Sequence, residues 1–169
     1  DLHLSIRRQR QMCIRDSTWE GGHRVPMIVR WPGRVPEGAV HSDPASLTDL
    51  LATFASLLDL ELPEGVGEDS LDLSRVFQGQ APEEPIRELV ISHSVNGAFT
   101  LRRGRWKLIL GTEGSGGWVA PADSTNPSDE SIGQLYDLEE DPAETTDLFG
   151  EEPAIVAELQ ALLDGVRGR

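Results

Sequence analysis

Apolar residues recur along this chain with a helical spacing in two segments. Over Ser46–Leu60 they fall three or four positions apart, which predicts a helix with Thr48 or Asp49 as its N-cap. A second stripe predicts a helix over Ala154–Val166, with Pro153 in its first turn. We interpret the first stripe as core packing rather than as a membrane or partner surface; it comprises Leu47, Leu50, Leu51, Phe54, Leu57 and Leu58.

Short apolar runs between turn residues predict the strands. Val25–Trp31 is such a run and predicts a buried strand. Pro26 is compatible with this strand because it lies at the first positions, where no ladder donor is lost. The double glycine in Glu20–Gly22 predicts a turn just before it, since glycine adopts backbone angles closed to other residues. The other predicted strands are Glu88–Ser94, a hairpin over Ala98–Leu110 that turns at Arg103 and Gly104, and Gln134–Leu138.

The order of these elements predicts a fold class. A strand and a helix come first, then three or four antiparallel strands, then a helix, which indicates the end of an α/β domain followed by a small α+β unit. We therefore expect residues 18–87 to be the C-terminal end of the α/β domain. Residues 88–169 are expected to form the small unit, with its antiparallel sheet and terminal helix.

Residues 1–17 fit neither pattern. They have no helical or strand period, and they resemble the conceptual translation of a transposon-type sequencing adapter, so we leave them out of the fold. The alternative is a genuine disordered basic tail. The segment holds four arginines and two aspartates, so it carries +2 and the remainder carries −16. It also holds Cys13, the one cysteine of the chain.

Charge and cysteine content argue against several kinds of partner and of structural site. The chain has 29 acidic and 15 basic residues, a net charge of −14, which argues against nucleic-acid or anionic-membrane partners. A single cysteine excludes an internal disulfide framework and a multi-cysteine zinc site. No run reaches the roughly 20 apolar residues of a membrane helix.

Candidate chemistry is sparse. His93 ends a predicted strand before a tight turn, where it either contacts a ligand or plays a structural part. Trp118 follows a glycine-rich stretch. It either stacks against a sugar or aryl group or anchors its own loop to the domain. The basic cluster of Arg102, Arg103, Arg105 and Lys107 either binds an anion or pairs with acidic neighbours. The acidic stretch Asp137–Asp147 lacks the EF-hand pattern, so we favour a solvated turn over a calcium site.

Five segments in order resemble the C-terminal portion of type I sulfatases, of the arylsulfatase A-type branch. The resemblance runs from about Thr18 to Leu163. The segments are STWEGGHRVPMIVRWPGRVP (17–36), SLTDLLATFASLLDLELP (46–63), GEDSLDL (67–73), FTLRRGRWKLIL (99–110) and QLYDLEEDPAETTDL (134–148). The family implies an α/β fold of the alkaline-phosphatase superfamily with a smaller domain on a four-stranded antiparallel sheet, and localisation that is exported or lysosomal.

The resemblance also implies a chemistry. Type I sulfatases hydrolyse sulfate esters with a formylglycine nucleophile, made from the cysteine of a Cys-x-Pro-Ser-Arg motif, and with a calcium ion held by Asp and Asn residues. This chain has no such motif, and the family's sulfate-contacting lysine, five residues before Glu20, corresponds to Arg15 in the adapter-like segment. We therefore expect no catalytic residue and no metal ligand here, and an inactive fragment of an enzyme that acts on sulfated carbohydrates or aryl sulfate esters.

Three residues are expected to contact substrate in the intact enzyme: His93, Trp118 and His23, the last because it lies in the segment after the active-site lysine. Two alternatives remain open at this point. One is a phosphonate or phosphodiester hydrolase of the same superfamily. The other is a free-standing acidic interaction domain without catalysis.

Overall fold

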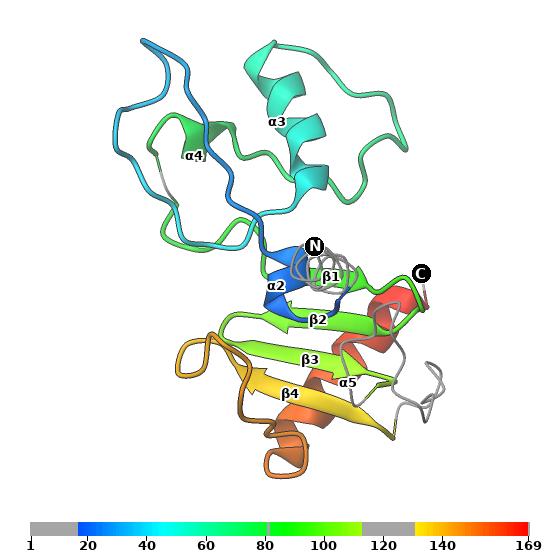
Figure 1. The fold of residues 1–169 in the computed structure, drawn as a ribbon. Coiled ribbons are helices and arrows are strands. Elements are labelled where there is room, and N and C mark those ends of the chain that lie inside the picture. Colours follow the sequence, from blue (N-terminus) through cyan, green and yellow to red (C-terminus); the bar gives the residue numbers. More distant parts are fainter. Residues whose placement is uncertain (1–16, 81, 113–130, 169) are drawn as a thin grey trace, which may run out of the picture. The chain divides into compact units, whose positions relative to one another are not determined.

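The computed structural model describes residues 17–80, 82–112 and 131–168. The predictions for Cys13, Arg15 and Trp118 therefore lie outside the described residues. The chain forms two compact units (Figure 1). One unit is Pro26–Val90, and the other combines the described residues up to Val25 with those from Ile91 onward.

The second of these units is built on a four-stranded sheet. Its strands are β1 (Leu89–His93), β2 (Phe99–Arg103), β3 (Trp106–Leu110) and β4 (Gly133–Asp137), in the order β1-β2-β3-β4. β3 pairs antiparallel with both β2 and β4. The β2–β3 hairpin closes at the pair Arg103–Trp106, and Gly104 has a φ of +56° there. The predicted antiparallel sheet and hairpin are thus confirmed.

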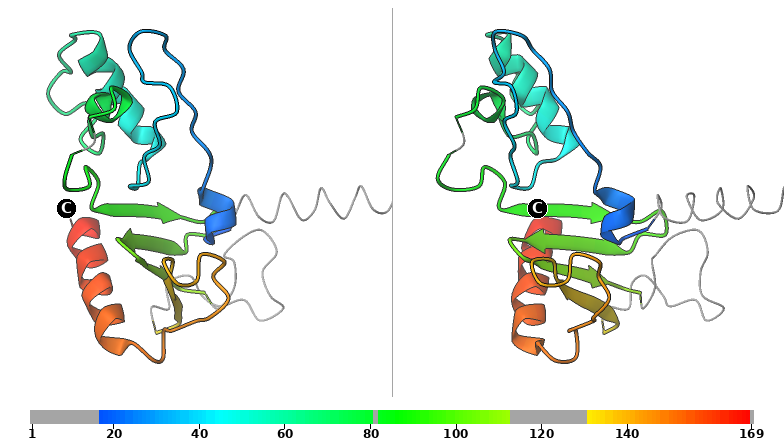
Figure 2. Two further views of the ribbon diagram at one scale, coloured as in Figure 1. Left: turned by 90° about the vertical axis from the view of Figure 1, so that its left-hand side faces the viewer. Right: turned by 60° about the vertical axis from the view of Figure 1, so that its left-hand side comes forward.

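Helix α5 (Pro153–Arg167) covers one face of this sheet (Figure 2). Leu101, Leu108 and Leu135 lie opposite one another on β2, β3 and β4, and all three are fully buried. The buried residues of α5 are Val156, Leu159 and Leu163. The predicted terminal helix is confirmed, and Val166 near its C-terminal end is exposed.

The other face of the sheet is polar. Side chains alternate between the two faces of a strand, so the residues next to the buried leucines point the other way. On β3 and β4 these include Lys107, Gln134 and Tyr136, all of which are buried. A buried polar face needs partners for each donor and acceptor, and this face holds the candidate site described below.

The Pro26–Val90 unit contains three short helical segments. A 3-10 turn, η1 (Leu47–Asp49), leads directly into α3 (Leu50–Leu57), and α4 (Ser74–Phe77) follows later. The helix predicted over Ser46–Leu60 is confirmed in shorter form. Asp49, one of the two predicted caps, occupies the N-cap position of α3, but its side chain makes no cap hydrogen bond there. The side-chain cap is Ser46, at the N-cap of the 3-10 turn, and the Asp49 carboxylate accepts the Ser46 backbone N–H and so completes a capping box.

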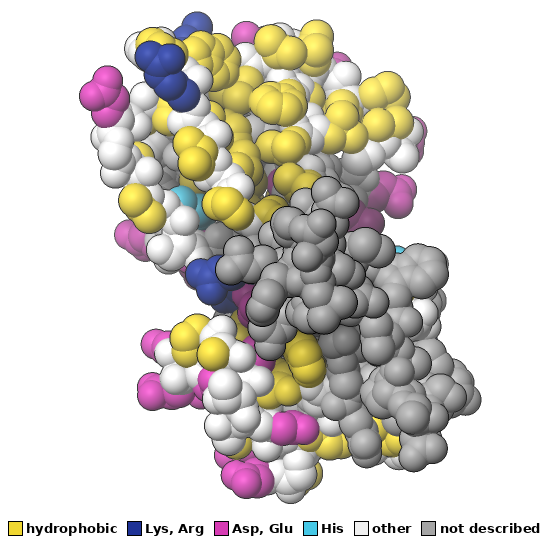
Figure 3. All heavy atoms as spheres, viewed as in Figure 1, with side chains coloured by type: hydrophobic (Ala, Val, Ile, Leu, Met, Phe, Trp, Pro, Cys, Tyr) yellow, Lys and Arg dark blue, Asp and Glu magenta, His cyan; other side chains and the backbone are white. Residues whose placement is uncertain are grey.

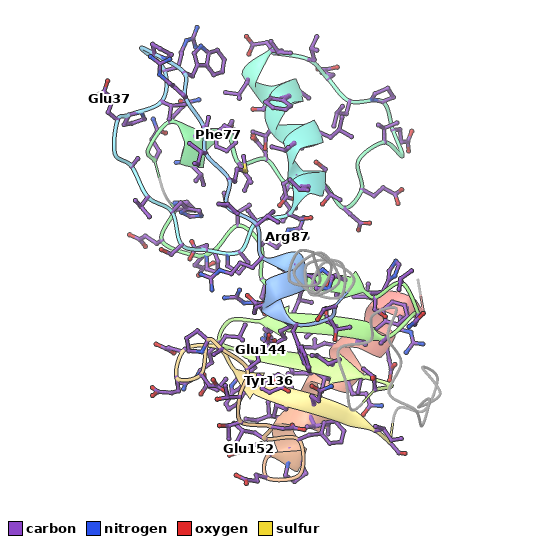
Figure 4. The ribbon with its side chains drawn as sticks, in the orientation of Figure 1. Glu37, Phe77, Arg87, Tyr136, Glu144 and Glu152 are labelled. Carbon is purple, nitrogen blue, oxygen red and sulfur yellow. The ribbon has the colours of Figure 1, made fainter. Side chains whose placement is uncertain are left out.

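The apolar stripe of this helix is not core among the described residues. Leu47, Leu51, Phe54 and Leu58 are all exposed, whereas Asp49, Thr53 and Ala55 are buried. The buried side is polar because the Asp49 carboxylate accepts hydrogen bonds from the Leu71 backbone and from Arg87. Arg87 is labelled in Figure 4. The prediction of core packing was therefore wrong for these four residues, whereas Leu50 and Leu57 of the same stripe are half-buried. Periodicity shows that a helix has two faces and not which neighbour covers each one.

The strand expected at Val25–Trp31 does not form. The segment is extended without strand pairing, and Ile28 is 91% exposed. A strand exists only as part of a ladder, and no described segment pairs with these residues. The prediction identified an apolar extended run correctly and its burial incorrectly.

Candidate functional site

Lys107 lies at the centre of the polar face of the sheet. It sits on β3, its side chain is 3% exposed, and its Nζ donates to Glu144 Oε1 at 2.7 Å and to Glu20 Oε1 at 3.1 Å. Arg102, the neighbour of Lys107 across the β2–β3 pair, lies 3.7 Å from the other oxygen of Glu20. Two carboxylates thus meet two cations in a largely water-excluded place. We call Glu20, Lys107 and Glu144 the charged triad.

The charged triad joins three distant parts of the chain. Glu20 begins α2 (Glu20–His23), and its backbone N–H donates to Glu144 Oε2 at 2.6 Å. Glu144 has a φ of +55°, a backbone conformation that residues other than glycine adopt rarely. The backbone here aims the Glu144 carboxylate at both Lys107 and the start of α2.

The segment before His23 is a helical turn. The turn predicted at Glu20–Gly22 is confirmed as a feature, but its reason was wrong, because Gly21 and Gly22 do not adopt left-handed angles. The triad and Trp19, not glycine's conformational freedom, hold this segment against the sheet.

Trp19 anchors the same segment through neutral hydrogen bonds. Its indole Nε1 donates to Gln134 Oε1 at 2.9 Å, and the Tyr136 hydroxyl donates to the same oxygen at 2.6 Å. Gln134 in turn donates to the Thr112 carbonyl at 3.0 Å. Burial, and then the negative charges of Asp147 and Glu144, raise the pKa of Tyr136 to about 12, so the phenol stays protonated as a donor (Figure 4).

The acidic stretch after β4 is a hydrogen-bonded turn. The Asp141 carboxylate accepts the backbone N–H groups of Thr145 and Thr146, and Asp147 accepts that of Leu135. Within the described residues there is no group of three His, Cys, Asp or Glu side chains that could hold a metal ion. This part of the chain does not fit the calcium site that the family implies.

The basic cluster is paired with acidic residues. Besides Lys107 and Arg102 on the polar face, Arg103 pairs with Glu158 of α5, and Arg105 with Asp137. This favours the pairing interpretation of the cluster over anion binding.

Two of the three predicted substrate contacts lie in the sheet unit. His23 ends α2 and is exposed; its pKa is lowered by partial desolvation and then by the charges of Lys107 and His93, with Glu20 opposing. His93 ends β1 and is also exposed, with Nδ1 3.0 Å from the Ser94 carbonyl oxygen and its ring 5.9 Å from that of Phe99. The role of both histidines stays a prediction.

Sequence reasoning did not find the carboxylate partners of Lys107. Glu20 and Glu144 lie 87 and 37 positions from it, and no local spacing connects them. One signal was available: the only lysine of the chain stands at a predicted strand position between two apolar residues, Trp106 and Leu108. A cation at such a position requires buried counter-charges.

The comparison with known families supplies the assignment. Residues 15–168 match the family described as N-sulphoglucosamine sulphohydrolase, C-terminal. The chain belongs to this family. It is the C-terminal region of a type I sulfatase sequence, as the resemblance of the five segments implied, and the predicted fold class is confirmed.

Curated relatives and a solved structure agree with this family assignment. The N-acetylgalactosamine-6-O-sulfatase of Bacteroides thetaiotaomicron is 31% identical over 90% of this chain and 29% of that protein. Human arylsulfatase A is 36% identical over 89% of this chain and 31% of that protein. A solved sulfatase, described under the metabolism of multiple glycosaminoglycans by Bacteroides thetaiotaomicron, is 32% identical with a TM-score of 0.74, over 90% of this chain and 31% of its own. The sulfatase-family chain described here thus spans about a third of the length of these relatives.

Helices that cross a bilayer are long and apolar throughout. No helix among the described residues has that length and hydrophobicity.

Proposed function

We propose that this chain works as the C-terminal part of a sulfatase that hydrolyses sulfate esters on carbohydrates. The family match over residues 15–168 carries the proposal. The identity of 31% to an N-acetylgalactosamine-6-O-sulfatase supports a sulfated sugar as the substrate class. The matches reported above are all to sulfatases, so nothing favours a phosphodiester hydrolase or a free interaction domain.

In this proposal the sheet unit supplies a rim rather than the reacting groups. The charged triad and Trp19 hold α2 against the polar face of the sheet, which fixes the position of His23. His23 and His93, together with Trp118 beyond the described residues, contact the sugar. In the intact enzyme a formylglycine residue would supply the nucleophile and a calcium ion would supply the electrophilic cation. Within the described residues of this chain no group of side chains could hold that ion.

The test joins this chain to an enzyme that can supply that region. Residues 18–168 replace the matching segment of the Bacteroides thetaiotaomicron N-acetylgalactosamine-6-O-sulfatase, and release of sulfate from N-acetylgalactosamine 6-sulfate is measured. We expect activity from the chimera and none from the 169-residue chain alone. Sulfate release by the chain alone, or a folded chimera that cleaves a phosphodiester and not the sulfate ester, contradicts the proposal.

The rim contacts are tested in the same chimera. His23→Ala and His93→Ala are expected to raise KM by about tenfold, the value of one lost polar contact of 1.4 kcal/mol, with a smaller effect on kcat. Val95→Ala is the matched control, because Val95 is exposed next to the same turn as His93. Equal kinetics for all three variants contradict a substrate role for the histidines.

A further inference from the structure

Helix α2 has few side chains that can fix its position. It consists of Glu20, Gly21, Gly22 and His23, so only its first and last residues carry a side chain. A helix of four residues is not stable by itself, because forming the first turn orders several residues for very few hydrogen bonds. The position of His23 therefore depends on what holds the start of the helix.

The backbone links His23 to the start of the helix. The Gly22 N–H donates to the Trp19 carbonyl at 2.8 Å, and the Arg24 N–H donates to the Glu20 carbonyl at 2.8 Å. These two hydrogen bonds tie the residues on either side of His23 to Trp19 and Glu20. The contacts that hold the Trp19 and Glu20 side chains therefore orient His23 as well.

Glu20 and Trp19 are held by chemically different partners. Glu20 belongs to the charged triad, whereas the Trp19 indole Nε1 donates to Gln134 Oε1 at 2.9 Å. Gln134 lies 115 positions further along the chain, on β4, and is 3% exposed. Acidic side chains are prominent on the sheet unit in the view of Figure 3, but a neutral amide–indole hydrogen bond has no net charge on which their field can act. Gln134 thus gives α2 a second point of attachment, which does not depend on charge.

The Gln134 amide is held in one orientation. Its Nε2 donates to the Thr112 carbonyl at 3.0 Å, and the Tyr136 hydroxyl donates to its Oε1 at 2.6 Å. The reversed amide would place donors against donors, so only the observed orientation satisfies all of these groups. Thr112, Gln134 and Tyr136 are each at most 5% exposed. Because its own rotamer is locked in this way, Gln134 can hold the indole in a defined place.

We propose that Gln134 is a positioning residue for substrate binding: by holding the Trp19 indole it fixes α2, and so sets where the His23 imidazole meets the sugar. Gln134 does not touch the substrate and acts through Trp19 and the α2 backbone. This inference rests on the proposed function, because it takes His23 as a substrate contact.

The test uses the chimera described above and two variants that break the same hydrogen bond from opposite ends. Gln134→Leu removes the acceptor. Trp19→Phe removes the donor and leaves Gln134 Oε1 paired, because the Tyr136 hydroxyl still donates to it. Each variant is expected to raise KM for N-acetylgalactosamine 6-sulfate by about fivefold, the value of one net hydrogen bond, with a smaller effect on kcat. Trp19→Phe decides the matter where Gln134→Leu does not fold.

Coupling to His23 separates positioning from a merely structural role. In a chimera that also carries His23→Ala, Trp19→Phe is expected to change KM by less than about twofold, because the contact that it displaces is already gone. A merely structural role lowers the amount of folded enzyme in both backgrounds and leaves KM unchanged. Tyr136→Phe is the matched control: it removes the other hydrogen bond to the same oxygen and leaves the indole bound, so its KM is expected to stay within about twofold.

Hydrogen exchange gives a readout that needs no sulfate release. In the 169-residue chain the amides of Gly22 and Arg24 are expected to exchange about fivefold faster in Trp19→Phe, and at an unchanged rate in Tyr136→Phe. The Leu108 amide, in the middle of the sheet, is the reference for unfolding of the whole unit.

The outcomes separate this inference from the proposed function. Sulfate release with an unchanged KM in Trp19→Phe, or with the same rise in KM when residue 23 is alanine, overturns the positioning role and leaves the function standing. Equal rises in KM for Trp19→Phe and Tyr136→Phe do the same. A chimera that releases no sulfate contradicts the function, and exchange then decides the anchoring of α2: faster exchange at Gly22 and Arg24 supports it, and unchanged exchange overturns it.

Discussion

Replacing Lys107 by methionine removes the ammonium group that lies between two buried carboxylates. Methionine has a similar length and no charge, so the change tests the electrostatics of the charged triad more than its packing. Lys107 is 3% exposed, Glu144 5% and Glu20 14%, so water cannot replace the lost cation fully. Arg102, 3.7 Å from Glu20, is the remaining positive charge nearby.

The magnitude follows from burial. Removing one partner of a buried ion pair costs about 3–5 kcal/mol, because the other charge is left without compensation. Here two carboxylates lose their partner, and Arg102 offsets part of the loss only at Glu20. We therefore expect Lys107→Met to lower the free energy of unfolding by about 3–5 kcal/mol. Adding Glu144→Gln removes one uncompensated charge and recovers about 1–3 kcal/mol of it.

The assay is urea unfolding of the 169-residue chain, followed by tryptophan fluorescence. Trp19 reports on the relevant unit because its indole is bound to Gln134. Arg103→Met is the matched control: its ion pair with Glu158 is exposed, at 38% and 60%, so the loss is expected to stay below about 1 kcal/mol. Equal destabilisation by Lys107→Met and Arg103→Met, or no recovery in the double variant, refutes the reasoning from burial.

Three further predictions concern single groups. Burial alone would raise the pKa of Asp49, but hydrogen bonds, first from Arg87, hold this pKa below its usual 3.8. The ionised Asp49 therefore stabilises the folded state above that pH, and this contribution is lost as the pH falls. Urea unfolding should accordingly show a weaker acid dependence for Asp49→Asn than for the unsubstituted chain. Partial desolvation, and then the charge of Lys107, lower the pKa of His23 below 6.5. Protonation of His23 therefore favours the unfolded state, and the free energy of unfolding should fall as the pH decreases from 6.5. A midpoint at or above pH 6.5 in an NMR titration of the His23 imidazole contradicts this. A Cβ on Gly133 would lie 2.6 Å from a backbone oxygen of β3, so Gly133→Ala should cost about 1–3 kcal/mol and lower the Tm, while Gly150→Ala, which has open space, should not.

The sequence by itself determined the elements whose signals are local. The β2–β3 hairpin follows from two alternating runs and a glycine at the turn, and Gly104 does adopt the left-handed conformation that this turn requires. Helix α5 follows from its apolar period and from Pro153 at its start. The family resemblance was also readable, because five segments in a fixed order are more specific than any one of them. Each of these depends on residues that are close together in the sequence.

Tertiary structure decided which faces are buried and which charges meet. The stripe on α3 has the period of a core helix, yet Asp49 on its other side is the buried residue, because a distant arginine reaches it. Val25–Trp31 has the composition of a strand but no described neighbour to pair with. Lys107 is paired with Glu20 and Glu144 only because the fold places α2 and the turn after β4 on the polar face of the sheet. Burial and charge pairing depend on contacts between residues far apart in the chain, and sequence periodicity contains no information about those.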